Sequence, residues 1–204
     1  GLVHTAYKLF LTYAYERGDL SRVYPIARGG APLLVLIFGA IWLSDVVRPL
    51  EYMGVIVIGL GLALMARGVF TSGESRRMLP FAIGSALATA AYSILDGMGA
   101  RLAGDAQFFV GWMFLLDGIF FGTFTGLMLG LKPYRAQARV WVRGAMAASV
   151  SYGAYAIVVW AMTVAPIALV TALRETSILF AVLIDWLVYG EGINRGKAGA
   201  AVAI

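Results

Sequence analysis

The stretch FFVGWMFLLDGIFFGTFTGLMLGL, residues 108–131, is an apolar run with a single charged residue, Asp117. A helix needs about 20 apolar residues to cross the hydrocarbon core of a bilayer, and this run is long enough. It lacks the strict alternation of apolar and polar residues that is typical of a transmembrane β-strand. The stretch therefore predicts a membrane-spanning α-helix.

Apolar runs of the same kind lie on both sides of this helix, with short polar connections between them. Their bounds, set by charges, Gly and Pro, predict helices over residues 2–15, 23–43, 50–66, 79–98, 108–131, 140–165 and 167–189, and a stub from residue 198. We therefore predict an all-α fold, a polytopic transmembrane helical bundle.

The composition excludes several function classes. Of the 204 residues 61% are hydrophobic and 13% are charged, whereas a soluble domain is about a quarter charged. The net charge of +5 is spread over many connections, so no basic patch for nucleic acid is expected. With no Cys, one His and no phosphate-binding glycine motif, neither a cofactor nor an enzyme active site is expected. The expected partners are the lipid bilayer and a small-molecule solute.

The chain also contains a repeat with an offset of about 145 residues. The matched pairs are Arg28 with Arg174, Trp42 with Trp186, Asp45 with Glu191, and Gly54 with Gly199. Between two matched helices lies an odd number of predicted spans, so the two copies are expected to be inverted in the membrane. Inverted repeats of this kind are typical of secondary transporters.

The run GDLSRVYPIARGGAP, residues 18–32, leads into an apolar helix ending at Asp45 and a glycine-rich helix with Gly54 and Gly59. This pattern resembles the second part of an EamA domain, and residues 166–199, with Glu191 at the helix end, resemble the same part again. The chain is thus similar to the drug/metabolite transporter (DMT) superfamily, whose members commonly have two five-helix EamA repeats.

That resemblance implies a division of the chain. Residues 1–70 would be the last three helices of the first EamA repeat, and residues 78–204 the second repeat with an incomplete final helix. The chain would then be a piece, truncated at both ends, of a ten-helix protein.

Two patterns predict opposite membrane orientations. The first, third, fifth and seventh connections hold most of the loop Lys and Arg residues, whereas the others hold only Arg48 and Arg101. The positive-inside rule places the first set in the cytoplasm. A ten-helix DMT member with both termini in the cytoplasm would place the first connection outside, so the orientation stays open.

Charged residues within predicted spans are the first candidates for function, because a charge in the membrane costs several kcal/mol unless it faces protein or water. They are Lys8, Arg28, Asp96, Asp117, Arg174, Glu175 and Asp185. Asp96 and Asp185 lie near predicted helix ends, where an interfacial or structural role is expected. The single His4 is by itself a weak signal for proton transfer.

Arg28 and Arg174 are the predicted substrate-binding residues. Arg28 lies between Pro25 and Pro32, which predicts a locally broken helix that binds an anionic group; the alternative is an Arg that reaches the interface from a kinked helix. Tyr152 and Tyr155, well inside their span, are predicted to line the same cavity, with plain core packing as the alternative.

Asp117 and Glu175 are predicted to couple protons or to form ion pairs with the arginines. Asp117, in mid-span, is expected to pair with Arg28 or Arg174 if it does not carry a proton. Arg174 and Glu175 are neighbours on a helix and diverge by about 100°, so each is expected to find its partner on another helix. The alternative for this pair is a purely structural buried ion pair.

Four glycines, Gly118, Gly122, Gly126 and Gly130, follow one another at a spacing of four. This pattern predicts a face where another helix packs closely. The neighbour could belong to the same chain or to a second copy, which leaves a homodimer open.

We therefore predict a secondary transporter in a bacterial inner membrane that moves a small metabolite by alternating access, as an exporter or exchanger. An anionic or zwitterionic organic solute is the expected class of metabolite. The alternative is a non-transporting membrane accessory or assembly subunit.

Overall fold

The computed structural model describes residues 1–18, 20–43, 45–71, 76–177 and 180. The described residues form helices α1 (Leu2–Tyr15), α2 (Leu20–Trp42), α3 (Pro49–Thr71), α4 (Leu79–Ala103), α5 (Ala106–Leu129), α6 (Ala138–Val164) and α7 (Ile167–Glu175), with 3-10 turns η1 (Arg76–Met78) and η2 (Pro133–Arg135). No strand occurs in this part of the chain. The prediction of an all-α helical membrane bundle is confirmed.

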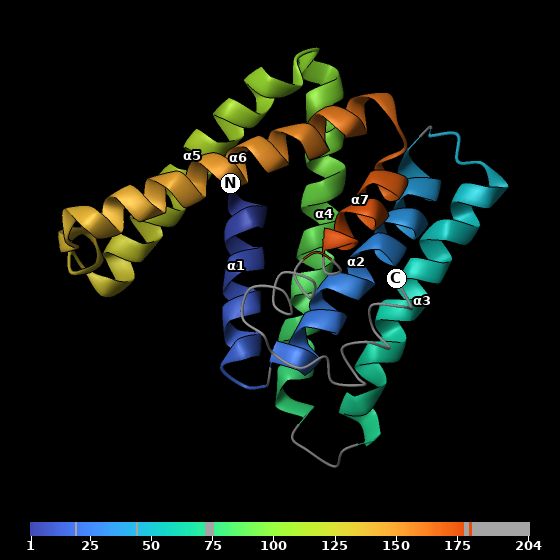
Figure 1. The fold of residues 1–204 in the computed structure, drawn as a ribbon, viewed down its shortest axis with the longest axis horizontal. Helices are drawn as coiled ribbons and strands as arrows, with labels where there is room; N and C mark the ends of the chain where they lie inside the picture. The colour runs from blue at the N-terminus through green and yellow to red at the C-terminus, as the bar shows by residue number, and fades with distance from the viewer. Residues whose placement is uncertain (19, 44, 72–75, 178–179, 181–204) are drawn as a thin grey trace.

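Helix α4 is the centre of the bundle. It packs against α1, α2, α5, α6 and α7, while α5 and α6 form a hairpin that leans away from the other helices (Figure 1). The approach of α7 to α4 depends on Gly97, where a methyl group would lie 2.5 Å from Ile167 Cδ1. A side chain at this position would require the Ile167 side chain to move.

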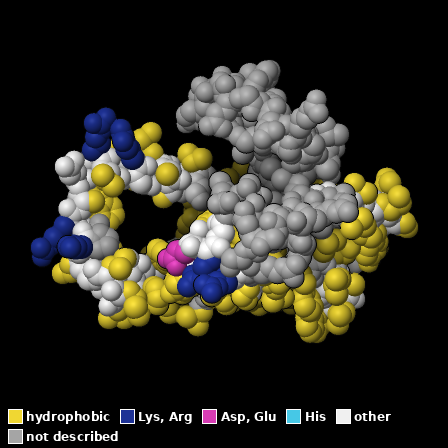
Figure 2. All heavy atoms as spheres, turned by 90° about the horizontal axis from the view of Figure 1, so that it is seen from below, with side chains coloured by type: hydrophobic (Ala, Val, Ile, Leu, Met, Phe, Trp, Pro, Cys, Tyr) yellow, Lys and Arg dark blue, Asp and Glu magenta, His cyan; other side chains and the backbone are white. Residues whose placement is uncertain are grey.

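Three helices are long and apolar enough to cross a membrane within the described residues: α4, α5 and α6. Shorter apolar helical stretches are Ile26–Trp42 and Pro49–Gly61. Helices α5 and α6 expose large apolar side chains, among them Trp112, Phe120 and Trp160. Hydrophobic side chains cover much of the described surface in Figure 2, and its Lys and Arg side chains lie both at the left, where the α5–α6 turn lies in Figure 1, and near the middle of the view beside an acidic group. Such a surface is stable in lipid and unfavourable in water.

Two helix ends that matter for the predicted site residues differ from the sequence-based prediction. Helix α4 continues to Ala103 rather than residue 98, so Asp96 lies about two turns from its end. Helix α5 ends at Leu129, and Gly130, with a φ of 67°, is its left-handed cap. Gly130 is therefore not part of the predicted glycine face.

The predicted break in the helix around Arg28 is wrong. Helix α2 runs without interruption through Pro25 and Pro32. A proline removes one backbone donor and disturbs the preceding turn, but the neighbouring helices α3 and α4 hold α2 along its length. The carbonyl groups of a broken helix are thus not available next to Arg28.

Candidate substrate and coupling site

A buried carboxylate lies between two arginines where α2 meets α7. Glu175 is 1% exposed, and its Oε1 lies 3.7 Å from Arg28 Nη1 and 3.5 Å from Arg174 Nη2. We call Arg28, Arg174 and Glu175 the arginine group. Its residues lie at the end of α7 and in the first half of α2, so the packing of these helices brings together residues that are far apart in the sequence.

The sequence predicted that Arg174 and Glu175 point away from each other and that each finds a partner on another helix. The second part is correct, and the first is wrong. Each contacts another helix, since Glu175 approaches Arg28, and the Arg174 guanidinium lies 5.7 Å from the centre of the Tyr92 ring. The two neighbours also approach each other directly. Glu175 is the last residue of α7, where the long Arg174 side chain can fold back over the helix end.

A second cluster adjoins the arginine group on the other side of Tyr92. The His4 ring of α1 stacks on Tyr92 with ring centres 4.5 Å apart, and His4 Nε2 lies 3.1 Å from Asp96 Oδ2. The Tyr155 hydroxyl of α6 donates a 2.6 Å hydrogen bond to the same Asp96 oxygen. We call His4, Asp96 and Tyr155 the aspartate group. Tyr92 links the two groups, so five helices supply one connected polar network.

Sequence reasoning missed most of the aspartate group. Asp96 was expected at an interface because its helix was predicted to end two residues later, and the longer α4 instead buries it to 6% exposure. Tyr92 lies one turn before Asp96 on α4, a spacing that places both on one face. The contacts of His4 could not be predicted from the residues around it, because its partners Asp96, Tyr92 and Tyr155 lie on other helices.

Several buried polar atoms of this region make no hydrogen bond to any described residue. They include Glu175 Oε1 and the Nε and Nη2 atoms of Arg174, together with the hydroxyls of Ser85, Thr89 and Ser93 on α4. These three side chains are fully buried and recur every fourth residue, so they form one stripe along α4. Buried polar atoms nearly always have a partner, which makes this interior suited to a polar ligand or to ordered water.

Asp117 lies apart from the arginine group, and its predicted partner is wrong. Its Oδ2 accepts a 2.5 Å hydrogen bond from Lys8 Nζ of α1, and Lys8 also lies over the Phe121 ring. The reason is the packing of α5 on α1 rather than on α2 or α7. Asp185, another predicted intramembrane charge, lies outside the described residues.

The Lys8–Asp117 pair gives a testable prediction. Asp117→Asn should lower the free energy of unfolding by about 1 kcal/mol. The effect is small because the Lys8 side chain is 36% exposed, so its ammonium group is not buried when the carboxylate is lost. The double variant Lys8→Met, Asp117→Leu should restore stability, since it leaves no charge without a partner. A denaturant titration in detergent micelles measures both, and equal losses in the single and double variants would contradict a paired role.

Tyr152 and the glycines are not brought to the arginine group. Tyr152 packs edge-on against Phe114 of α5, with ring centres 5.2 Å apart. A methyl group at Gly118 would meet no described atom within 4 Å, and the Tyr134 hydroxyl donates to the Gly122 carbonyl. Tyr134 of η2 thus lies against Gly122 and Gly126, and close packing of a transmembrane helix at Gly118, Gly122 and Gly126 stays a prediction.

At one end of the bundle, Arg101 of α4 joins three further segments. It donates two hydrogen bonds to Asp45, at 2.5 and 3.2 Å, and two to the last carbonyls of α6, those of Met162 and Ala165. Asp45 also accepts from the first backbone amide of α7, that of Ile167. We call this set the Arg101 clasp. It ties the α2–α3 connection to the ends of α4, α6 and α7.

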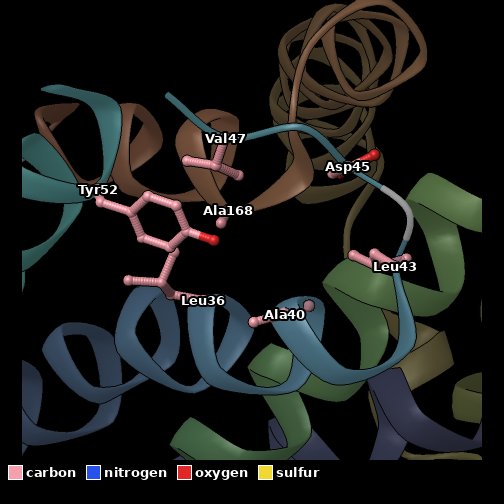
Figure 3. Close-up of a pocket in the computed structure, with 8 residues that line it drawn as sticks. Leu36, Ala40, Leu43, Asp45, Val47, Tyr52 and Ala168 are labelled. Atoms are coloured by element: carbon pink, nitrogen blue, oxygen red, sulfur yellow. The ribbon is translucent and has the colours of Figure 1, made fainter. Parts of the chain in front are cut away.

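Beside the clasp lies a small pocket, with room for about one water molecule. Its lining residues include Leu36, Ala40, Tyr52 and Ala168, with Asp45 at its edge, and Figure 3 shows Tyr52 of α3 reaching over Leu36 toward its centre. The pocket is too small for a metabolite, so this end of the bundle is tightly packed.

A helical bundle with lipid-compatible outer helices and a polar network inside defines a polytopic membrane protein with a charged interior. The model of the EamA-like transporter family matches residues 76–204, which is more than half of the chain. The chain belongs to this family and is thus a membrane transporter of the DMT type. No curated protein and no solved structure matches it.

Proposed function

We propose that this protein is a secondary transporter for a small anionic or zwitterionic metabolite, and that the arginine group is its substrate site. The observation that carries the proposal is the burial of Glu175 between Arg28 and Arg174. Two guanidinium groups that approach one buried carboxylate form a site of cationic donors inside a membrane protein, and an anionic group of the solute would bind to these donors.

The chemistry of the site favours a carboxylate, phosphate or phosphonate group. A guanidinium presents its donors in a planar fork that fits such oxyanions bidentately. Two of the Arg174 nitrogens make no hydrogen bond to the described residues. The hydroxyls of Ser85, Thr89 and Ser93 would add neutral donors nearby on α4.

We further propose the division into repeats at residues 1–70 and 78–204, inverted relative to each other and rocking about the site in an exchange or export cycle. In support, Arg28 and Arg174 occupy matched positions of the repeat, and both approach Glu175. Residues near a pseudo-two-fold axis lie close to their own counterparts, and substrate sites of such transporters lie at the repeat interface. A bacterial inner-membrane location and a homodimer belong to the same proposal.

The test is solute exchange in proteoliposomes loaded with amino acids, organic acids or phosphonates. Arg174→Ala should lower the affinity for the transported anion about 10- to 100-fold, because it removes a charge-assisted contact worth about 1.5–3 kcal/mol. Arg174→Lys should recover part of that loss. Arg143→Ala, an exposed position on α6, is the matched control and should leave exchange unchanged.

Two results would contradict the proposal. One is exchange that prefers cations and does not change in the Arg174 variants. The other is no exchange of any solute by a folded protein that co-purifies with a stoichiometric partner, which would favour the accessory subunit instead.

A further inference from the structure

We propose that the side-chain hydroxyls of Ser85, Thr89 and Ser93 determine which anion this protein binds, and that the solute is an organic anion carrying hydroxyl groups. We call these three residues the hydroxyl row. The inference rests on the proposed function, because it takes the arginine group as the site that binds the anionic end. It adds the chemistry of the rest of the solute, which the charge of the site alone does not define.

The hydroxyl row lies on the part of α4 between its contacts with α1 and its contacts with α2. A methyl group at Gly84 would lie 2.9 Å from Phe10 Cδ1 of α1, and one at Gly30 of α2 would lie 3.2 Å from Ala86 Cβ. Ser85 lies between these two positions of α4, and the other two residues of the row follow it at the helical spacing of four. All three side chains are fully buried. The row therefore points into the interior of the bundle.

The hydroxyl row runs alongside the arginine group. At its far end, the ring of Tyr92 lies 5.7 Å from the Arg174 guanidinium, and two buried nitrogens of that guanidinium make no hydrogen bond to a described residue. At its near end, α2 packs on α4 at Gly30, two residues after Arg28. Successive hydroxyls of the row lie about 6 Å apart along the helix. An elongated solute held at the arginines can therefore contact more than one of them.

The three hydroxyls are buried without a hydrogen bond to any described residue. A hydroxyl on a helix can donate to the carbonyl one turn back, and Thr171 does so on α7, where it is fully buried and its Oγ1 lies 2.8 Å from the Ile167 oxygen. Ser149 does the same on α6. A buried hydroxyl without a partner destabilises the folded protein. Hydrogen-bonding groups of a solute would supply the partners that the helix does not.

Hydroxyl groups recognise other hydroxyl groups, because each can donate one hydrogen bond and accept two. The guanidiniums of the arginine group only donate, so they favour the anionic end of any solute. A site that hydrogen-bonds a solute hydroxyl rejects the analogue without it, because the buried groups of the site are then left unpaired. The arginine group and the hydroxyl row together favour hydroxylated organic acids and phosphate esters over anions with apolar chains.

The first experiment compares anions that differ in their hydroxyl groups. Butyrate, 3-hydroxybutyrate and threonate share one carbon chain length and one carboxylate, and propyl phosphate and glycerol 3-phosphate are the equivalent pair of phosphate esters. The stabilisation of the protein in micelles by increasing concentrations of each anion gives its affinity. Threonate should bind about 10- to 100-fold more tightly than butyrate, with 3-hydroxybutyrate between them, because each hydroxyl adds a hydrogen bond. The phosphate esters should show the same preference.

Substitutions in the hydroxyl row should reduce this preference. Thr89→Val and Ser93→Ala should each reduce the ratio of threonate to butyrate affinity about three- to tenfold, without weakening butyrate, and Thr89→Ser should keep the ratio. Thr171→Val is the matched control, because it makes the same change at a buried hydroxyl that has its partner in its own helix. An unchanged ratio in Thr89→Val and Ser93→Ala, or an equal reduction in Thr171→Val, overturns the inference.

The second experiment measures stability without any solute. Because the Thr89 hydroxyl has no described partner, Thr89→Val should leave the free energy of unfolding in micelles unchanged or raise it, whereas Thr171→Val should lower it. Structural water between the hydroxyls predicts the opposite for Thr89→Val, since the change would break its hydrogen bonds. A loss in Thr89→Val as large as that in Thr171→Val would assign the row to structural water and overturn the inference.

The outcomes separate this inference from the proposed function. If Arg174→Ala weakens every anion by a similar factor while changes in the hydroxyl row have no effect, the arginine group remains the anion site and the inference about the row is refuted. If none of these anions binds the folded protein, or Arg174→Ala leaves every affinity unchanged, the proposed function is refuted and the inference with it.

Discussion

Glu175→Gln should lower the free energy of unfolding by about 3–5 kcal/mol, the largest effect we expect from a single conservative change in this chain. Glu175 is 1% exposed and lies within 3.7 Å of both Arg28 and Arg174. The amide keeps the shape but removes the negative charge between two guanidiniums. Breaking a buried ion pair costs more than never having formed it, because the remaining charge stays buried.

A denaturant titration in detergent micelles measures this loss. The matched control is Glu16→Gln, the same chemical change at an ion pair with Arg17 in which Glu16 is 57% exposed, and it should alter stability by less than about 1 kcal/mol. The double variant Glu175→Gln, Arg28→Met should recover part of the stability. Equal effects of the two single changes would show that the arginine group does not act as a buried ion cluster.

Arg101→Ala should lower the free energy of unfolding by about 2–3 kcal/mol. The change removes four hydrogen bonds of the Arg101 clasp and leaves Asp45 with one described partner, the Ile167 amide. Arg101→Lys should recover only part, since an ammonium cannot reproduce the bidentate fork. Arg48→Ala, an exposed change at the same end, should stay within about 0.5 kcal/mol of the unmodified protein.

Arg101→Ala should also open the end of the bundle where the Arg101 clasp lies. The chain has no cysteine, so a single Cys at Ala168, a pocket residue that is 4% exposed, reports on access there without background. A membrane-impermeant maleimide should label this Cys slowly with Arg101 present and several-fold faster in Arg101→Ala. Equal labelling rates would show that the clasp does not close this end.

The sequence pattern predicted the elements far better than the contacts between them. Apolar runs predicted α1 with the same bounds and α2 to α6 to within about five residues, because lipid requires long apolar helices whatever their neighbours. The helix predicted over residues 167–189 was wrong at its end, since α7 ends at Glu175, and residues 181–189 lie outside the described part of the chain. The end of α4 was predicted five residues too early. Asp96 was therefore expected at the membrane interface, whereas the structure buries it in the interior. The prolines of α2 do not interrupt the helix, which packs against α3 and α4.

The partners of the charged residues were harder to predict. The structure brings Arg28, Arg174 and Glu175 together, and their roles in binding and coupling stay predictions. Asp117 was assigned to the wrong cation. A carboxylate in a membrane span needs an opposite charge nearby, and any cation on a neighbouring helix can supply it. Lys8 is that neighbour only because α5 packs on α1.

The sequence by itself determined that this protein is a helical membrane transporter of the EamA type with charges in its spans. Hydrophobic length and the residue pattern of the EamA-like transporter family are properties of the chain that need no neighbours. Only the tertiary structure decided that His4, Tyr92 and Asp96 connect to the arginines, and that Arg101 joins four segments. These contacts depend on the rotation and packing of helices far apart in the sequence, and a hydrophobic pattern leaves that rotation open for helices that are apolar nearly all round.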